Sequence, residues 1–347
     1  MRYDVVIATR NRPNTLRRCL AHLANQSEKP VRVVIVDASD DDATTHGGVF
    51  DGLDRKIEWG IVEADCQNAA RQRNLGLAST ESDVVFLPDD DSMLYQDAAK
   101  NMMEGYRSDV DGRIAGVGGC AASGPPQEFL DRAIRSRASL KDRLEPARNL
   151  YESRFSPKPF ETYAQELWAA RGLPDWLCAN ADFTPVEAIG GYLLSLRRES
   201  ALEHQFDETL GAGIGYSIHE DMDLCLRLQA DGYLLIAAMR APIFHDRFPG
   251  RRAAGYNYGF CWIANYLYVC CKSIPKESPS YRIDLPRFMR HKLRIYRLGA
   301  LLSRSIYDRD VAAGALDAWA QRSELMDCSS DQLSDTYRRW CTTMIRS

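Results

Sequence analysis

Short apolar runs alternate with segments of helical periodicity along the first third of the chain. The apolar runs are residues 3–8, 31–36, 57–62 and 83–87, and helical spacing covers residues 16–23 and 69–78. Runs of valine and isoleucine without polar alternation are typical of parallel strands that are buried on both faces. Strands that alternate with helices favour a sheet with helices on both sides. The pattern therefore predicts an α/β fold with a mostly parallel sheet.

Polar side chains follow three of these strands. Thr9 follows the first, Asp37 follows the second, and residues 89–91, all aspartate, follow the fourth. Ligands of open α/β sheets bind at the carboxyl ends of the strands. Crowded carboxylates raise one another's pKa unless a cation lies among them. Mg²⁺ or Mn²⁺ would remove that repulsion and share its coordination with substrate phosphates. The alternative is a solvated acidic turn.

A second acidic cluster, His219, Glu220 and Asp221, opens a predicted helix over residues 221–232. Acidic residues are favoured at helix N-termini, and this accounts for one or two of them. The glycine-rich residues 211–215 lie just upstream and suggest a loop that delivers the helix start to a site. A carboxylate there can accept the proton of an attacking hydroxyl.

His245 follows a strand-like run at residues 241–244. A histidine in this position is more often a structural hydrogen-bonding residue. Arg247, Arg251 and Arg252 follow it, and arginine forks suit phosphate oxygens. A structural histidine is therefore one interpretation, and the nearby arginines support the other, a metal–diphosphate site.

The remaining sequence predicts an insertion within the α/β fold and a separate helical region after it. Residues 121–185 are rich in charge, proline and aromatic side chains, with helical stretches at 129–143 and 162–171, and they predict an insertion or lid. Residues 251–347 are predicted to be mostly helical. We expect a catalytic domain over residues 1–250, made of a nucleotide-binding half (1–115), the insertion and a catalytic half (186–250), followed by the helical region.

Composition excludes some functions. A net charge of −4 and a pI near 5.9 argue against a nucleic-acid binder. The ten cysteines contain no CxxC pair, which predicts free thiols in a reducing compartment. The longest apolar stretch, residues 258–271, is shorter than the roughly 20 residues that span a bilayer. No signal peptide precedes the first strand, so we expect a soluble cytoplasmic protein.

Residues 282–304 combine basic side chains with interleaved apolar ones. One interpretation is a basic amphipathic helix on the inner face of an anionic membrane, so that the C-terminal helices make a peripheral contact. The other, which we favour on sequence grounds, is an ordinary surface helix packed on the catalytic domain.

Taken in order, these segments resemble the inverting GT-A glycosyltransferases of family 2. The resemblance covers roughly residues 1–115 and 186–250. It rests on residues 5–13, 33–39, 68–76, 86–91 (a DXD motif) and 220–228, then Gly232, Tyr233 and His245. Residues 121–185 and the C-terminal region lie outside it, so acceptor choice cannot be carried over.

The resemblance implies a role for each matching residue. Nucleotide contacts are expected from Thr9, Arg10, Asn11, Arg12, Asp37, Asn68, Arg71, Asp89 and Asp90. The metal ligands would be Asp89, Asp91 and His245, and the donor sugar or acceptor would meet Gly191, Tyr192 and His219. Asp221 would be the general base, supported by Glu220.

The resemblance also implies a fold, cofactor and reaction. The fold would be GT-A, a Rossmann-like α/β fold, here with a C-terminal helical extension. The reaction would transfer a sugar, with inversion, from a nucleotide-diphosphate donor to a hydroxyl of a glycan, a lipid-linked glycan or a small molecule, assisted by Mn²⁺ or Mg²⁺. The donor would be a UDP- or dTDP-sugar if Asp37 accepts from an imide N–H, although guanine stays open.

Two other functions remain as alternatives. A nucleotidyltransferase that makes nucleotide sugars would carry a glycine-rich phosphate loop after the first strand, and residues 9–13 contain no glycine. A non-catalytic nucleotide-sugar binding module would not need Asp89, Asp91, Asp221 and His245, all of which are present.

Overall fold

The computed structural model describes residues 1–41, 48–126, 156–211, 217–247, 253–303 and 305–345. The contacts divide the chain into two compact units. The sheet unit comprises Met1–Phe129, Arg171–Glu208 and Glu220–Gly250, and the helical unit comprises Leu130–Ala170, Thr209–His219 and Arg251–Ser347. Some of the sequence predictions fall outside the described residues. They are the helix at 129–143, residues 212–215 of the glycine-rich segment, and Arg251 and Arg252.

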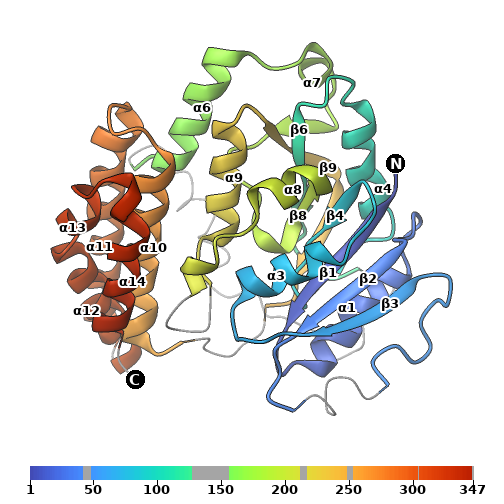
Figure 1. Cartoon of the computed structure of the whole chain (residues 1–347), viewed down its shortest axis with the longest axis horizontal. Helices are drawn as coiled ribbons and strands as arrows, with labels where there is room; N and C mark the ends of the chain where they lie inside the picture. Colours follow the sequence, from blue (N-terminus) through green and yellow to red (C-terminus); the bar gives the residue numbers. More distant parts are fainter. Residues whose placement is uncertain (42–47, 127–155, 212–216, 248–252, 304, 346–347) are drawn as a thin grey trace. The chain divides into compact units, whose positions relative to one another are not determined.

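The sheet unit is built on one mixed sheet with the strand order β3-β2-β1-β4-β8-β6-β9-β5, and β7 pairs with β9 (Figure 1). The strands are β1 (Tyr3–Thr9), β2 (Arg32–Asp37), β3 (Glu58–Glu63), β4 (Val84–Phe86), β5 (Ser92–Leu94), β6 (Ile114–Ala121), β7 (Phe183–Pro185), β8 (Leu194–Arg197) and β9 (Leu234–His245). The predicted α/β class is confirmed.

The first four strands pair in parallel, as the sequence predicts, and β6 pairs in parallel with β9. Strand β8 runs antiparallel between β4 and β6 and joins these two groups. β5 and β7 add short antiparallel pairings to β9. β9 runs in the same direction as β4, so its C-terminal end lies at the edge of the sheet at which β4 ends.

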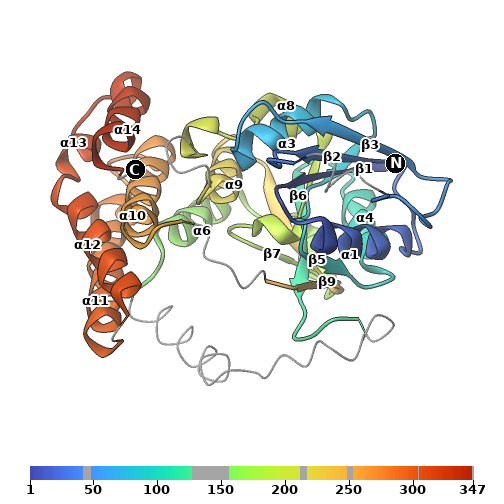
Figure 2. The same ribbon diagram turned by 90° about the horizontal axis from the view of Figure 1, so that it is seen from below.

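Helices cover both faces of this sheet (Figure 2). α1 (Pro13–Ala24) and α4 (Ala98–Ser108) lie on one face, where α4 packs on β6 and β9. α3 (Ala69–Ala78), α8 (Arg198–His204) and α9 (Glu220–Ala230) lie on the other, with the short α7 (Asp175–Ala179) beside β7. The side chains predicted to face inward from α1 are all buried, namely Leu16, Cys19, Leu20 and Leu23.

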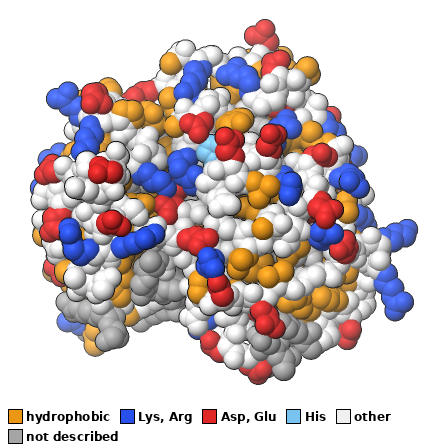
Figure 3. Space-filling view, viewed as in Figure 1, with side chains coloured by type: hydrophobic (Ala, Val, Ile, Leu, Met, Phe, Trp, Pro, Cys, Tyr) orange, Lys and Arg blue, Asp and Glu red, His pale blue; other side chains and the backbone are white. Residues whose placement is uncertain are grey.

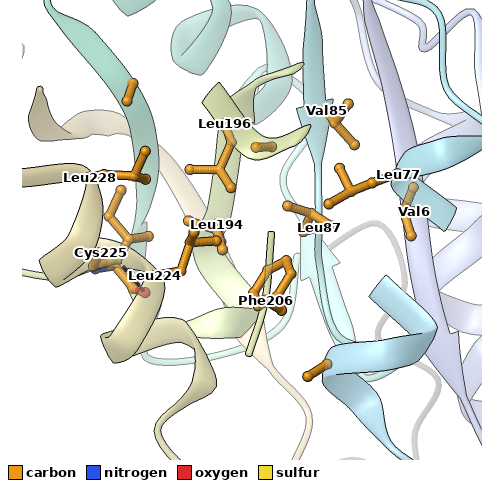
Figure 4. Close-up of a cluster of buried hydrophobic side chains, with 14 of the residues drawn as sticks. Val6, Leu77, Val85, Leu87, Leu194, Leu196, Phe206, Leu224, Cys225 and Leu228 are labelled. Carbon is orange, nitrogen blue, oxygen red and sulfur yellow. Dashed lines mark hydrogen bonds between the residues drawn. The ribbon is translucent and has the colours of Figure 1, made fainter. Parts of the chain in front are cut away.

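The core on the α3 side joins strands to helices α3 and α9 (Figure 4). Leu77 of α3 packs with Val6 of β1 and Val85 of β4, while Leu224 and Leu228 of α9 pack with β8. Each of these side chains is fully buried. The apolar contacts hold the N-termini of α3 and α9 at fixed positions on the sheet, and both termini carry candidate functional residues.

The helical unit contains α6 (Pro159–Arg171, whose last residue falls in the sheet unit), α10 (Gly255–Ser273), the π-helix η4 (Ser280–Asp284), α11 (Leu285–Leu302), α12 (Ile306–Ala320), α13 (Ser323–Met326) and α14 (Ser330–Met344). α10 packs on α12 and α14. None of the described helices is both long and apolar enough to cross a membrane. On the face drawn in Figure 3, acidic, basic and apolar side chains are interspersed.

One buried amide organises the polar interior of the helical unit. Asn265 on α10 is fully buried and donates through Nδ2 to the carbonyls of Leu210 (3.2 Å) and Ile218 (2.8 Å). Its Oδ1 accepts from the Tyr337 hydroxyl of α14 at 2.6 Å. A single side chain therefore anchors both ends of the segment that leads into α9.

Two glycines allow α10 and α12 to approach each other closely. A Cβ added at Gly314 of α12 would lie 2.0 Å from the carbonyl oxygen of Tyr256, and one at Gly259 of α10 would lie 2.0 Å from that of Val311. These neighbours are backbone atoms, which cannot rotate away. Only glycine fits at this helix crossing.

We therefore expect Gly314→Ala to destabilise the protein by about 1–3 kcal/mol through overpacking. Gly299→Ala on α11 is the matched control, because nothing lies within 4 Å of its added Cβ. That control should be neutral or stabilising by about 0.5–1 kcal/mol. Chemical denaturation of the two variants measures the difference, and equal free energies of unfolding would contradict the close crossing.

Candidate active site

The acidic turn after β4 meets the loop after β1. Asp90 is buried, and its carboxylate accepts from the Thr9 hydroxyl at 2.8 Å and from Arg12 Nη1 at 3.0 Å. Burial raises the pKa of Asp90 to about 6, with the Arg12 charge opposing the rise. Asp90 thus ties the two strand ends together.

Asp89, Asp91 and His245 form a three-residue cluster at the same edge. One ligand atom from each lies within 4.8 Å of the other two. His245 reaches this position because it ends β9 and pairs with Ser92 of β5, directly after the acidic turn. The backbone N–H of Asp246 also donates to the Asp91 carbonyl at 2.9 Å. The backbone therefore fixes the histidine beside the aspartates.

The chemistry of this cluster fits a divalent metal ion. His245 Nε2 lies 3.0 Å from Asp91 Oδ1, and the buried Nδ1 of the same ring has no hydrogen-bond partner among the described residues. Tyr192 stacks on the imidazole with ring centroids 4.4 Å apart and fixes its plane. Carboxylate oxygens with one imidazole are a donor set that divalent cations accept.

Arg73 on α3 connects this cluster to the second acidic cluster. Its Nη2 donates to Asp89 Oδ1 at 2.8 Å and its Nη1 donates to Glu220 Oε1 at 2.7 Å. The side chain is only 5% exposed. Burial alone would lower the pKa of Arg73, but Glu220 and Asp89 raise it above its ordinary value. The guanidinium is therefore a permanent buried cation between two acids.

Asp221 lies in the same network through the backbone of Gly191. The Gly191 N–H donates to Asp221 Oδ2 at 2.8 Å, and the N–H of Met222 donates to Oδ1 at 2.8 Å. A Cβ at Gly191 would lie 2.9 Å from Arg73 Nη2, so a side chain here would push into the ion pairs. Burial raises the pKa of Asp221 and of Glu220, and the Arg73 charge opposes both rises.

The chain is similar to known glycosyltransferases in sequence and in fold. Residues 4–148 match the model of Glycosyl transferase family 2. Over this segment the chain is similar to the glycosyltransferases of that family. Together with the fold, the match identifies the protein as a glycosyltransferase, that is, an enzyme of the glycosyl-transferring class.

Solved structures share the fold at low sequence identity. TarS residues 1–349 from S. aureus is 14% identical, with a TM-score of 0.52, and the match covers 97% of this chain and 89% of that one. Its complex with UDP-GlcNAc is 13% identical, with a TM-score of 0.54, and the match covers 97% of this chain and 90% of that one. The mannosyltransferase PcManGT from Pyrobaculum calidifontis, in complex with GDP-Man and Mn²⁺, is 13% identical, with a TM-score of 0.54. That match covers 99% of this chain and 87% of the mannosyltransferase chain. No curated protein matches the chain.

The other expected nucleotide contacts of this glycosyltransferase lie on the two loops after β1 and β2. Asn11 adopts a left-handed backbone (φ 55°) and donates to Asp40 at 2.8 Å, and Arg10 pairs with the same aspartate at 3.2 Å. Asp37 is buried and accepts from the Ser39 N–H at 2.9 Å. The structure thus joins the two loops beside Thr9.

Asn68 and Arg71 both make contacts within the sheet unit. Asn68 caps α3, with Oδ1 accepting from Ala70 N (3.0 Å) and Arg71 N (3.3 Å), and its Nδ2 donates to the Glu208 carbonyl at 2.8 Å. Arg71 forms ion pairs with Asp65 and, at 3.1 Å, with Glu208. It is Arg73, two residues further on, that reaches the acidic clusters.

Sequence reasoning missed Arg73, although a signal for it existed. Ala70, Arg73 and Leu77 are spaced by three and four residues and share the buried face of α3. An arginine on an otherwise buried helical face needs acidic partners, because a buried charge is costly without them. That spacing would have separated Arg73 from the more exposed Arg71.

His219 lies in the helical unit and precedes Glu220 in the sequence. Its ring packs edge-on against Trp262 (centroids 4.9 Å apart) and Tyr266 (5.3 Å). Burial, followed by the Lys292 charge, lowers its pKa to about 3, so the imidazole is neutral at pH 7. The described contacts of the ring thus include two aromatic rings and a backbone hydrogen bond at Trp262.

This lowered pKa predicts a pH dependence of stability. Unfolded His219 titrates near its ordinary pKa of 6.5, whereas folded His219 titrates at about 3. Between these values the unfolded state binds more protons, so stability falls as the pH drops below about 6.5. We expect His219 to contribute a loss of about 1–2 kcal/mol between pH 7 and pH 5.

His219→Asn isolates this contribution, because asparagine does not titrate and tolerates the left-handed backbone at this position (φ 70°). Urea denaturation of both proteins at pH 7 and pH 5 should show a smaller acid loss in the variant. An identical loss in the two proteins would mean that His219 is not held neutral.

Proposed function

We propose that this glycosyltransferase is an inverting, metal-assisted enzyme that moves a sugar from a nucleotide-diphosphate donor to an acceptor hydroxyl. The observation that carries the proposal is the metal-type cluster of Asp89, Asp91 and His245, within 4.8 Å of one another and linked through Arg73 to the second acidic cluster. The sheet unit thus contains both the metal-type cluster and the candidate bases.

Asp89, Asp91 and His245 would hold Mn²⁺ or Mg²⁺. When bound, such an ion neutralises negative charge that develops on the diphosphate leaving group. Asp91 is fully buried while the side chain of Asp89 is 27% exposed, so Asp89 offers the more accessible carboxylate. The Mn²⁺ of the PcManGT complex supports a divalent ion in this fold.

For the nucleoside we propose uridine or thymidine, with Asp37 accepting from the imide N–H of the base. Thr9 and residues 10–12 would line the same side, because the loops after β1 and β2 are joined through Asp40. The similar structures carry UDP-GlcNAc and GDP-Man, so the fold accommodates more than one base. Gly191 and Tyr192 would back the donor sugar.

Asp221 is the residue that we assign as general base. Its raised pKa makes it a stronger base than an exposed aspartate, while the Arg73 charge favours its ionised form. It would take the proton of the acceptor hydroxyl as that oxygen attacks the anomeric carbon from the face opposite the nucleotide. Glu220, paired with Arg73, would position the network.

The acceptor would be a hydroxyl of a glycan, a lipid-linked glycan or a small molecule, and we propose the cytoplasm as the compartment. Acceptor recognition would fall to residues 121–185 and to the helical unit, because they lie outside the motifs of the donor side. A nucleotidyltransferase is disfavoured by the loop at residues 9–13, which contains no glycine.

The donor site predicts nucleotide binding that depends on metal. We expect one nucleoside diphosphate, UDP or dTDP, to raise the melting temperature in the presence of Mn²⁺ and much less in its absence, since a ligand stabilises the state that it binds. Asp91→Asn should abolish the metal-dependent part of the shift. Differential scanning fluorimetry with a panel of nucleoside diphosphates measures it.

Asp109→Asn is the matched control, because Asp109 is also a buried, ion-paired acid, bonded to Arg197 at 2.8 Å. The control should keep the Mn²⁺-dependent shift. A shift that persists unchanged in Asp91→Asn would refute the metal role of this aspartate.

The assigned base predicts a separate effect on turnover. Asp221→Asn should lower release of the nucleoside diphosphate from its sugar donor by about 10²–10⁴-fold, with nucleotide binding retained. Asp231→Asn, an exposed acid at the end of the same helix, should keep full activity. Full turnover in Asp221→Asn would remove it as the base, and absence of turnover in the wild type with retained binding would favour the non-catalytic binding module.

A further inference from the structure

Helix α11 of the helical unit carries charged side chains of one sign only. Between Leu285 and Leu302 it carries Arg287, Arg290, Lys292, Arg294 and Arg297 and no acidic residue. The chain as a whole has a net charge of −4. Positive charge is therefore concentrated on this helix against the overall balance.

The same helix exposes large apolar side chains at its C-terminal end. Leu301 and Leu302 are each 82% exposed and Leu298 is 55% exposed. Ile306, at the start of α12, is 71% exposed. Single exposed leucines are common on proteins, but a group on consecutive turns marks an interaction surface.

The arginines and the leucines share one face of α11. Arg290, Arg294, Arg297, Leu298 and Leu301 follow one another at helical spacings, and all are exposed. The opposite face is occupied, since Leu285, Phe288, Met289 and Leu293 are buried within the helical unit. We call the outward face, residues 287, 290, 294, 297, 298, 301 and 302, the basic–apolar face.

The arginines of this face are not used inside the protein. Among the described residues, Arg287, Arg294 and Arg297 form no ion pair, and Arg290 donates only to the carbonyl of Pro286 on its own helix at 3.0 Å. Lys292 differs, because its ammonium lies 4.4 Å from the ring centroid of Trp262. The outward arginines thus keep their guanidinium groups available for an anionic partner.

We propose that the basic–apolar face binds the surface of an anionic lipid bilayer, with α11 lying in the plane of the interface. Arginines would contact lipid phosphates while Leu298, Leu301 and Leu302 enter the acyl boundary, a combination that suits interfacial helices. A nucleic acid would satisfy the arginines but not the exposed leucines. No described helix can cross a membrane, so the contact would be peripheral.

This inference does not rest on the proposed function, because lipid binding is measured without donor or acceptor. The experiment is flotation of the full-length protein with vesicles of phosphatidylcholine, with and without phosphatidylglycerol. We expect flotation only with the anionic vesicles, and weaker binding at high salt because salt screens the arginine contribution.

Two double variants separate the two halves of the face. Arg290→Gln with Arg294→Gln should weaken binding to anionic vesicles by roughly 25-fold, from about fivefold for each arginine. Leu301→Ser with Leu302→Ser should weaken it by at least about tenfold, since leucine burial supplies the apolar part. Both sites are exposed, so the fold should persist and circular dichroism should be unchanged.

Matched controls lie in the sheet unit. Arg55→Gln with Lys56→Gln removes two exposed charges, and Val110→Ser removes a side chain that is 89% exposed. Both controls should float as the wild type does. Three outcomes would each overturn the proposal: no flotation of the wild type, equal flotation with neutral vesicles, or equal losses in the controls and the α11 variants. A protein partner would then be sought for this face.

Discussion

The candidate site depends on one buried guanidinium. Arg73 lies between Asp89 after β4 and Glu220 at the start of α9, and Asp221 adds its charge from the same helix turn. Without a cation, these carboxylates could not share a space from which water is largely removed. Gly191 completes the arrangement, because its missing side chain leaves room for the guanidinium and its N–H binds Asp221.

The parts of the site that the sequence predicts are those in which a residue follows directly from a strand. The aspartates of 89–91 follow β4, and His245 ends β9, so topology alone brings them towards one edge. Their meeting depends on the pairing of Ser92 with His245 between β5 and β9. A three-residue strand has too short a pattern to be predicted, and its partner lies far away in the sequence. The three residues could therefore be proposed as a ligand set from the sequence, whereas the register of β5 and β9 that brings them together could not.

Helix α3 shows what pattern reasoning leaves undetermined. Asn68, a nucleotide contact by resemblance, has the side chain and spacing of a helix cap, and its Oδ1 is used in this way. Arg71 and Arg73 are equally basic in the sequence, and only the buried face of the helix distinguishes them. The same limit applies to His219, whose pKa is lowered by burial beside Trp262 and Tyr266 and by the Lys292 charge, all of them distant in the sequence.

The charge balance of the site explains why donor and metal should bind together. Asp89, Asp90, Asp91, Glu220 and Asp221 face the guanidinium groups of Arg12 and Arg73, so negative charge is in excess. A diphosphate that entered alone would meet this excess and be repelled. A divalent cation held by Asp89, Asp91 and His245 would offset most of this excess and would present a positive charge to the diphosphate, since a bound ion is the largest charge in such a site. In the proposed function, the acids that make the site costly to fold would also make nucleotide binding conditional on the metal.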